Sequence, residues 1–138
     1  GVALKDALRS AFEKRFPDVR VVDLGTHGND SVHYPEFAFL AADKVAKGGG
    51  YAVLVCGSGI GMAIAANKVP GIRAAVGWDA TSARLTREHN DANVLCLGQR
   101  LIGAQVAEDA LVAWWTAAFA GGRHQERLER IRSRERTA

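Results

Sequence analysis

Apolar residues occur along the chain in two alternating arrangements, short continuous runs and longer stretches with helical spacing. In the first stretch Leu4, Leu8 and Phe12 share one face and charged residues the other, which indicates an amphipathic helix. Apolar runs bounded by glycine or proline indicate strands. By these rules we expect helices over residues 2–15, 35–47, 60–68, 80–89 and 104–119 and from residue 123, and strands over 19–24, 52–55, 72–76 and 94–97.

The order of these elements indicates the fold class. Strands alternate with helices at short spacing, which is typical of a parallel sheet whose two faces are covered by helices. The sequence therefore predicts an α/β fold, a three-layer α/β/α sandwich, formed as one domain over residues 1–138. The written chain begins on a helix, an unusual start for this class, so we expect a further strand to precede it.

Composition and cysteine usage exclude several classes of protein. An apolar content of 48% and a charged content of 24% over 138 residues are typical of a globular domain that needs no cross-links. We find no apolar run long enough to cross a bilayer and no signal peptide. Cys56 and Cys96 fall in separate strand-like segments, which argues against a disulfide framework or a zinc site. We therefore expect a cytoplasmic protein with no metal and no membrane partner.

The net charge of +3 arises entirely in the last part of the chain. From Arg123 onward there are six arginines and three glutamates, whereas the preceding residues carry twelve basic and twelve acidic side chains and sum to zero. This pattern favours a solvated terminal helix. Nucleic-acid binding is the weaker alternative, because no aromatic residue is interleaved with these arginines. We expect no nucleic-acid partner.

The segment with the clearest chemical content follows the strand expected over 52–55. Cys56 is followed by Gly57, Gly59 and Gly61 at alternate positions and then by a helix. Such a loop brings backbone N–H groups close to a ligand and can hold a phosphate or an oxyanion. A thiol at the carboxyl end of a strand, beside a helix N-terminus, can act as a base or nucleophile. The alternative is a buried cysteine before a tight packing turn, and neither the dinucleotide nor the Walker glycine pattern fits.

Two further clusters carry residue types that are used in catalysis. His89 and Asn90 suit proton transfer, because an imidazole exchanges protons near neutral pH and an amide can donate to an oxyanion. They also suit an ordinary helix C-terminus, with His89 facing the helix dipole and Asn90 in the left-handed conformation. Arg123 and Arg127 lie one helical turn apart, a spacing at which two guanidinium groups can clamp a phosphate.

Five spaced motifs together resemble a known family. They are residues 55–62 (Val-Cys-Gly-Ser-Gly-Ile-Gly-Met), 65–74, 87–94, 97–100 and 121–124. In this order they look like the type B ribose-5-phosphate isomerases, a family that also includes the galactose-6-phosphate isomerase subunits. The resemblance covers nearly the whole chain.

The resemblance implies a fold, an assembly and a reaction. The fold would be Rossmann-like, and the assembly a homodimer, or a tetramer, whose active sites draw residues from both chains. The reaction would be the aldose–ketose isomerisation of a sugar phosphate, ribose 5-phosphate by default, through an enediolate and without a cofactor. Cys56 matches the family's base, which moves a proton between C1 and C2 of the open-chain sugar. A subgroup uses a glutamate at the position of Met62 instead.

The resemblance also implies how the sugar phosphate is held. His89 matches the residue that assists opening of the sugar ring, and Asn90 matches a ligand of a substrate oxygen. The glycine loop, with Ser58 where the family has Ser or Thr, would hold the enediolate oxygens, and three arginines would bind the phosphate. The residues concerned are Gly57, Ser58, Gly59, Ile60 and Gly61 in the loop, and Arg100, Arg123 and Arg127 for the phosphate.

The written chain departs from the family pattern in two places. Gly1–Lys5 matches the segment that follows the family's first strand and its Asp-His pair, and neither the strand nor the pair is in the sequence. His33 stands where the family commonly has an aspartate. Two alternatives therefore stay open, an isomerase of a four- or six-carbon sugar phosphate and a subunit that binds a sugar phosphate without catalysis.

Overall fold

The fold is built on a parallel sheet, and a computed structural model describes residues 2–25 and 34–137 of the chain. Within these residues the sheet has three strands, β1 (Ala52–Cys56), β2 (Ala74–Val76) and β3 (Val94–Gly98). β3 lies between the other two, with Cys56 opposite Gly98 and Val76 opposite Cys96. Every residue of β3 is buried, which is expected for a central strand covered on both faces.

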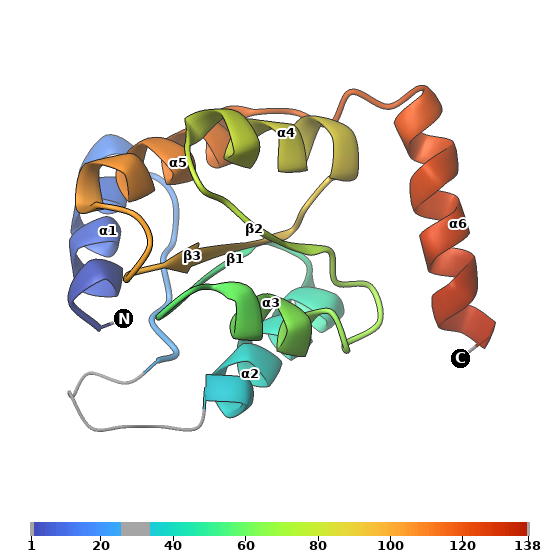
Figure 1. Cartoon of the computed structure of the whole chain (residues 1–138), viewed down its shortest axis with the longest axis horizontal. Helices are drawn as coiled ribbons and strands as arrows, with labels where there is room; N and C mark the ends of the chain where they lie inside the picture. The colour runs from blue at the N-terminus through green and yellow to red at the C-terminus, as the bar shows by residue number, and fades with distance from the viewer. Residues whose placement is uncertain (1, 26–33, 138) are drawn as a thin grey trace.

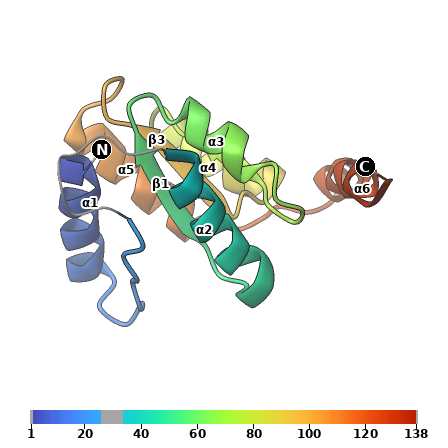
Figure 2. The ribbon, with the colours of Figure 1, turned by 90° about the horizontal axis from the view of Figure 1, so that it is seen from below.

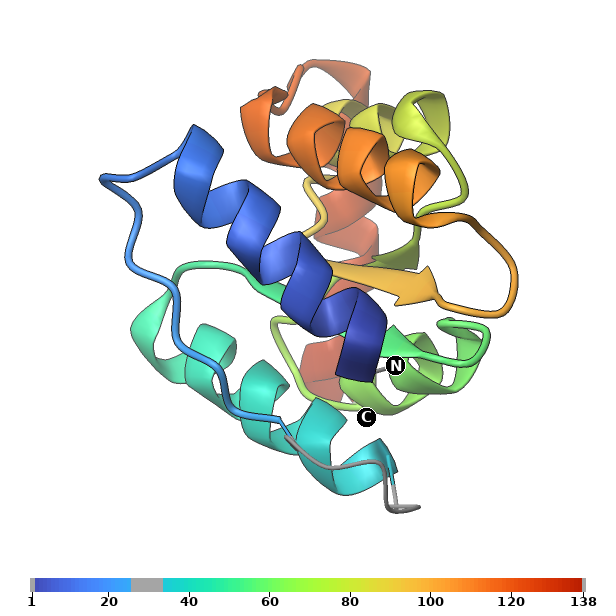
Figure 3. The ribbon, with the colours of Figure 1, turned by 90° about the vertical axis from the view of Figure 1, so that its left-hand side faces the viewer.

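Helices cover both faces of this sheet. On one face lie α2 (Tyr34–Gly48) and α3 (Ile60–Ala66); on the other lie α1 (Val2–Arg15), α4 (Ala80–Asn90) and α5 (Ala104–Thr116) (Figure 1). Figure 3 shows α1 running beside α5 on its face of the sheet. The three-layer α/β/α sandwich predicted from the sequence is therefore confirmed.

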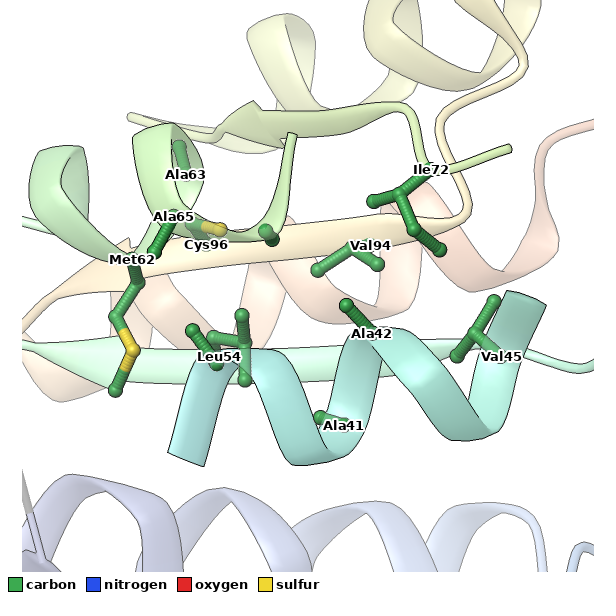
Figure 4. Packing of buried hydrophobic residues seen from close by; sticks show 12 residues of the cluster. Ala41, Ala42, Val45, Leu54, Met62, Ala63, Ala65, Ile72, Val94 and Cys96 are labelled. Carbon is green, nitrogen blue, oxygen red and sulfur yellow. The ribbon is translucent and has the colours of Figure 1, made fainter. Parts of the chain in front are cut away.

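Side chains of β3 alternate between two hydrophobic cores. Val94 and Cys96 point toward α2 and α3, where Met62 extends from α3 toward α2 (Figure 4). Leu95 and Leu97 point into the opposite core, which α1, α4 and α5 enclose. Because successive residues of a strand face opposite sides, a strand between two cores needs an uninterrupted apolar run. The run over 94–97 has this form.

The prediction of a strand over residues 19–24 is wrong, because no strand forms there in the described part of the chain. Val19 N–H instead donates to the Phe16 carbonyl, 3.1 Å away, in a turn after α1. Val21 packs on the α1/α5 core and Leu24 on the α2/α3 core. The apolar side chains thus serve as anchors for a segment that crosses the sandwich, and a strand also requires a neighbouring backbone to pair with.

Some element boundaries also differ from expectation. β2 begins at Ala74 rather than residue 72, because Ala74 is the first residue that pairs with β3; Asn67 bonds to both the N–H and the carbonyl of Ala74. α3 and α5 end at Ala66 and Thr116, short of the expected 68 and 119. α4 is capped by Asp79, whose carboxylate accepts the Ser82 N–H at 2.7 Å.

The terminal helix α6 (Arg123–Thr137) stands apart from the three layers (Figures 1 and 2). It touches the rest of the chain through a few contacts, including buried Leu128 and a hydrogen bond from Gly71 N–H to Glu135 Oε2 at 3.2 Å. Among the described helices, none is both long and apolar enough to cross a membrane. His27 and His33 lie outside the described residues.

Candidate functional site

A tight loop joins β1 to α3 at the carboxyl end of the sheet. Cys56 is the last residue of β1, and Gly59, with φ 79°, is the residue before the first turn of α3. A Cβ atom at Gly59 would lie 3.0 Å from the carbonyl carbon of Leu97. The loop therefore rests directly on the backbone of β3, in a conformation that favours glycine. This close approach fixes the loop relative to the strand.

The Cys56 thiol lies inside this loop as a hydrogen-bond acceptor. Gly59 N–H donates to Cys56 Sγ at 3.1 Å, and the first N–H groups of α3 have no partner within the helix. A donor aimed at sulfur stabilises negative charge on it. Cys96, in contrast, is fully buried in β3, and this burial raises the pKa of its thiol to about 12. Of the two sulfurs, Cys56 is the one placed to exchange a proton with a ligand.

The loop forms one wall of an open cleft with a volume of about 480 Å³. The cleft contains most of the loop residues predicted from the sequence, together with side chains that the sequence did not single out. Its lining consists of Tyr34, Cys56, Gly57, Ser58, Ile60, Gly61, Ile64, Arg100 and Leu101. Gly59 is buried on the side of the loop that faces β3, and Ser58 Oγ accepts the Ile60 N–H at 3.2 Å.

Arg100 supplies the positive charge of the cleft. Its N–H donates to the Gly57 carbonyl at 2.9 Å, while the N–H of Gln99 donates to the Cys56 carbonyl at 2.8 Å. The Arg100 side chain therefore lies along Gly57, where its Nε would be 3.6 Å from a Cβ atom. No acidic side chain is among the described residues that line the cleft. The cleft thus combines a thiol, backbone donors and a guanidinium group, a set suited to an anionic substrate.

Sequence reasoning missed three residues of the cleft lining, Ile64, Leu101 and Tyr34, of which Tyr34 carries a polar group. It is the first residue of α2, and its ring lies over the first turn of α3. A Cβ atom at Gly61 would come within 2.6 Å of that ring, so Gly61 provides the space that Tyr34 occupies. Pro35 signals a helix start, but nothing in the local pattern brings Tyr34 to a loop so far along the chain. Met62 lies in the core instead of the cleft, so its side chain takes no part in this site.

The second predicted cluster lies at the C-terminal end of α4. His89 is half-buried and its ring stacks on that of His124, with centroids 4.3 Å apart and planes 14° apart. Asn90 is exposed and ends the helix, and the left-handed residue is Asp91, with φ 46°, rather than Asn90 as the alternative interpretation had it. The structure brings His89 next to the start of α6, a contact that the positions of the motifs in the sequence did not reveal.

Positive groups surround His124 in this second cluster. Burial of the ring lowers the pKa of His124 below its ordinary value, and the neighbouring charges of His89, Arg123 and Arg127 lower that pKa further. Both arginines are exposed on the first turns of α6. A cationic surface with an imidazole at its centre can bind a phosphate or another anion.

Within one chain these two clusters lie at opposite ends of the strands of the sheet. Cys56 is opposite Gly98, at the carboxyl end of β3, whereas Asn90 precedes Val94 at the other end. β3 alone spans about 13 Å, at 3.3 Å per residue. His89 and Asn90 of one chain therefore cannot act on a small substrate at Cys56 of the same chain. Among the described residues, no group of three His, Cys, Asp or Glu side chains is arranged to hold a metal ion.

Comparison with known proteins agrees with the sequence resemblance. Residues 1–131 match the family model described as Ribose/Galactose Isomerase. The chain is 47% identical over 116 residues to "Ribose-5-phosphate isomerase B" of Escherichia coli, covering 82% of this chain and 76% of that protein. It is 44% identical over 117 residues to "D-erythrulose-4-phosphate isomerase 2" of Mycolicibacterium smegmatis, covering 83% and 76%.

Solved structures of similar proteins have the same fold. Ribose-5-phosphate isomerase B of Clostridium thermocellum superposes with a TM-score of 0.94 at 46% identity, covering 98% of this chain and 90% of that one. The enzyme of Mycoplasma genitalium, solved with bound ribulose-5-phosphate, superposes with a TM-score of 0.93 at 38% identity, covering 100% and 91%.

Proposed function

This chain belongs to the ribose/galactose isomerase family of sugar-phosphate isomerases, and we propose that it interconverts ribose 5-phosphate and ribulose 5-phosphate through an enediolate. The observation that carries the proposal is the cleft in which Cys56 Sγ, held by the Gly59 N–H, lies beside Arg100. The Mycoplasma genitalium relative, which matches the whole chain, binds ribulose-5-phosphate. These features support the same reaction from independent directions.

Cys56 acts as the base in this proposal. As a thiolate it takes the proton from C2 of the open-chain aldose, and the electron pair moves toward the carbonyl oxygen at C1, which gives the enediolate. The hydroxyl proton then passes from O2 to O1 and Cys56 returns its proton to C1, which leaves the carbonyl at C2. A proton beside a carbonyl is weakly acidic, so its removal requires donors aimed at the oxygen that becomes negative. Backbone N–H groups of the loop from Gly57 to Gly61, with Ser58 within it, supply these donors; those of Gly59 and Ile60 already donate to Cys56 Sγ and Ser58 Oγ. Arg100 attracts the phosphate.

The remaining groups come from a second copy of the chain. His89 and Asn90 cannot reach Cys56 of their own chain, so in this proposal the active site forms across a homodimer. The rim of the cleft supports this assembly, because Ile60, Ile64 and Leu101 are 47%, 59% and 52% exposed. A polar, anionic sugar phosphate would make few contacts with such apolar side chains, whereas a protein partner would bury them.

In the composite site each contributed residue has a separate task. His89 transfers a proton between the ring oxygen and the C1 hydroxyl, so that the furanose opens to the aldehyde. Asn90 donates to a substrate oxygen. Arg123 and Arg127, with Arg100 of the other copy, hold the phosphate, which gives bidentate donors at two sides of the same anion.

The test of the base compares the full-length parent protein with Cys56→Ala and with the matched control Cys96→Ala. Formation of ribulose 5-phosphate from ribose 5-phosphate is followed without added metal. We expect kcat to fall about 100-fold or more in Cys56→Ala, as removal of a general base typically does. Cys96→Ala should keep its kcat, because that thiol is buried in the core. Full activity in folded Cys56→Ala would show that another group is the base.

Subunit complementation tests the shared site. Cys56→Ala and His89→Ala should each keep only a low residual activity alone, but a hybrid dimer has one site with both changes and one site with neither. Co-expressed in equal amounts, the two variants should recover about a quarter of the parent activity, because half of the dimers are hybrids with one intact site in two. A mixture that stays inactive although hybrids are isolated would contradict a site that draws on both chains.

A four-carbon substrate is the second candidate. The 44% identity to an erythrulose-4-phosphate isomerase favours it specifically, since the two substrates differ by one CHOH unit. Comparison of kcat/KM on ribulose 5-phosphate and erythrulose 4-phosphate decides between them. No turnover of either by the folded parent would instead favour a subunit that binds sugar phosphate without catalysis.

A further inference from the structure

His124 has no task in the proposed reaction, although its ring stacks on that of His89. The two residues lie on different helices, α4 and α6, that are joined mainly at this end. The ring planes differ by 14° and the centroids lie 4.3 Å apart, so the two imidazoles are stacked face to face. A ring in this position restricts the rotation of the His89 side chain.

The backbone holds His124 in place independently of the side chain. Ala120 N–H donates to the Glu88 carbonyl at 2.9 Å, which fastens the loop after α5 to the end of α4. Gly121 and Gly122, with φ 70° and 57°, then turn the chain into α6, and His124 N–H donates to the Gly121 carbonyl at 3.1 Å. Backbone hydrogen bonds therefore fix the position of the His124 backbone relative to the end of α4.

The charges around the pair favour a neutral ring at position 124. Two imidazolium rings stacked at this distance would repel each other, and Arg123 and Arg127 add positive charge on the same side. The burial and charges that lower the pKa of His124 remove this repulsion by favouring the neutral form near neutral pH. A neutral aromatic face can then pack against His89 in either of its protonation states.

We propose that His124 is a positioning residue, which holds the His89 imidazole by ring stacking in the orientation needed to open the sugar ring. This inference rests on the proposed function of His89. Orientation matters because a misplacement of about 1 Å can lower a rate by up to about 100-fold. His89 is half-buried at the end of a helix, and its ring contact among the described residues is the stack with His124.

The test compares His124→Ala, which removes the ring, with His124→Phe, which keeps a flat ring without nitrogens. We expect kcat on ribose 5-phosphate to fall about tenfold in His124→Ala with KM nearly unchanged, because positioning acts on the chemical step. His124→Phe should restore kcat close to the parent value. In a His89→Ala background, His124→Ala should cause no further loss, since a residue that acts through His89 has nothing left to position.

Three results would overturn the inference. Equal losses in His124→Phe and His124→Ala would mean that the nitrogens matter, and an undiminished loss in the His89→Ala background would mean that His124 acts independently. A rise in KM, accompanied by weaker inhibition by inorganic phosphate, would mean that the ring merely docks α6 and its two arginines. Thermal unfolding of each variant confirms that the comparison is made between folded proteins.

A spectroscopic measurement keeps this inference separate from the proposed function. The His89 Hε1 resonance, assigned by its loss in His89→Gln, is shifted by the ring current of the stacked neighbour. We expect it to lose this shift in His124→Ala and to keep a ring-current shift of the same sign in His124→Phe. If the parent turned over no sugar phosphate, the proposed function would fail while this result still reported the stack; an unmoved resonance in His124→Ala would overturn the positioning role in either case.

Discussion

Replacement of Gly59 by alanine tests how the glycine loop is held on the sheet. Gly59 is buried, has φ 79° and stands directly before α3. An added Cβ would lie 3.0 Å from the carbonyl carbon and 3.2 Å from the amide nitrogen of Leu97. These are backbone atoms of β3, a strand that is buried along its whole length and cannot yield. The loop must therefore shift away from the strand by a few tenths of an ångström.

The expected loss of stability has two parts. A left-handed conformation costs a residue other than glycine about 1–2 kcal/mol, and the forced contact with the Leu97 backbone adds about 1–3 kcal/mol. The sum is about 2–5 kcal/mol. Gly50→Ala is the matched control, because Gly50 has φ 89° but no atom within 4 Å of an added Cβ. It should lose about 1–2 kcal/mol, the conformational part alone.

Urea unfolding at a fixed protein concentration measures both variants, and isomerase activity provides a second readout. Gly59→Ala should also lose kcat, because its N–H donates to Cys56 Sγ and moves with the loop. Gly50→Ala should remain active. Equal losses of stability in the two variants would refute the close approach of loop and strand. A fully active Gly59→Ala would refute the role of that N–H at the sulfur.

Four further predictions concern the cleft and the core. Gly61→Ala should leave stability nearly unchanged, because the Tyr34 ring can move aside, but it should raise KM as much as Tyr34→Ala does. In the Tyr34→Ala background, Gly61→Ala should stabilise the protein by about 0.5–1 kcal/mol. Iodoacetamide near neutral pH should label Cys56, with protection by sugar phosphate, and leave Cys96 unlabelled. Above pH 9 the free energy of unfolding of the parent should fall by up to about 1.4 kcal/mol per pH unit, because the raised pKa of Cys96 keeps its thiol protonated in the folded state while the unfolded thiol ionises. Cys96→Ala should lack this slope in urea unfolding. Trp114→Phe should cost about 1–3 kcal/mol in the same assay, because it removes a buried indole hydrogen bond to a backbone carbonyl at 3.0 Å; an unchanged midpoint would contradict its burial.

The local pattern of the sequence determined most of the elements and the chemistry of one loop. The apolar run over 94–97 could only suit a strand buried on both faces, and the helical spacing of Leu4, Leu8 and Phe12 required a helix with one buried face. The alternate glycines after Cys56 specified a tight loop before α3, which the structure shows. Such features depend on neighbours within a few residues, so a single sequence contains them.

Tertiary structure decided which of these features meet. Val19 to Leu24 has the composition of a strand, but pairing depends on a neighbouring backbone that local sequence does not specify. The parallel order of the sheet separates His89 from Cys56 by the length of β3, a distance that motif spacing does not reveal. Packing of α2 on α3 brings Tyr34 over Gly61, and the turn after α5 brings a second imidazole onto His89. Contacts between elements distant in sequence follow from how the layers assemble, and this is why the local pattern alone could not predict them.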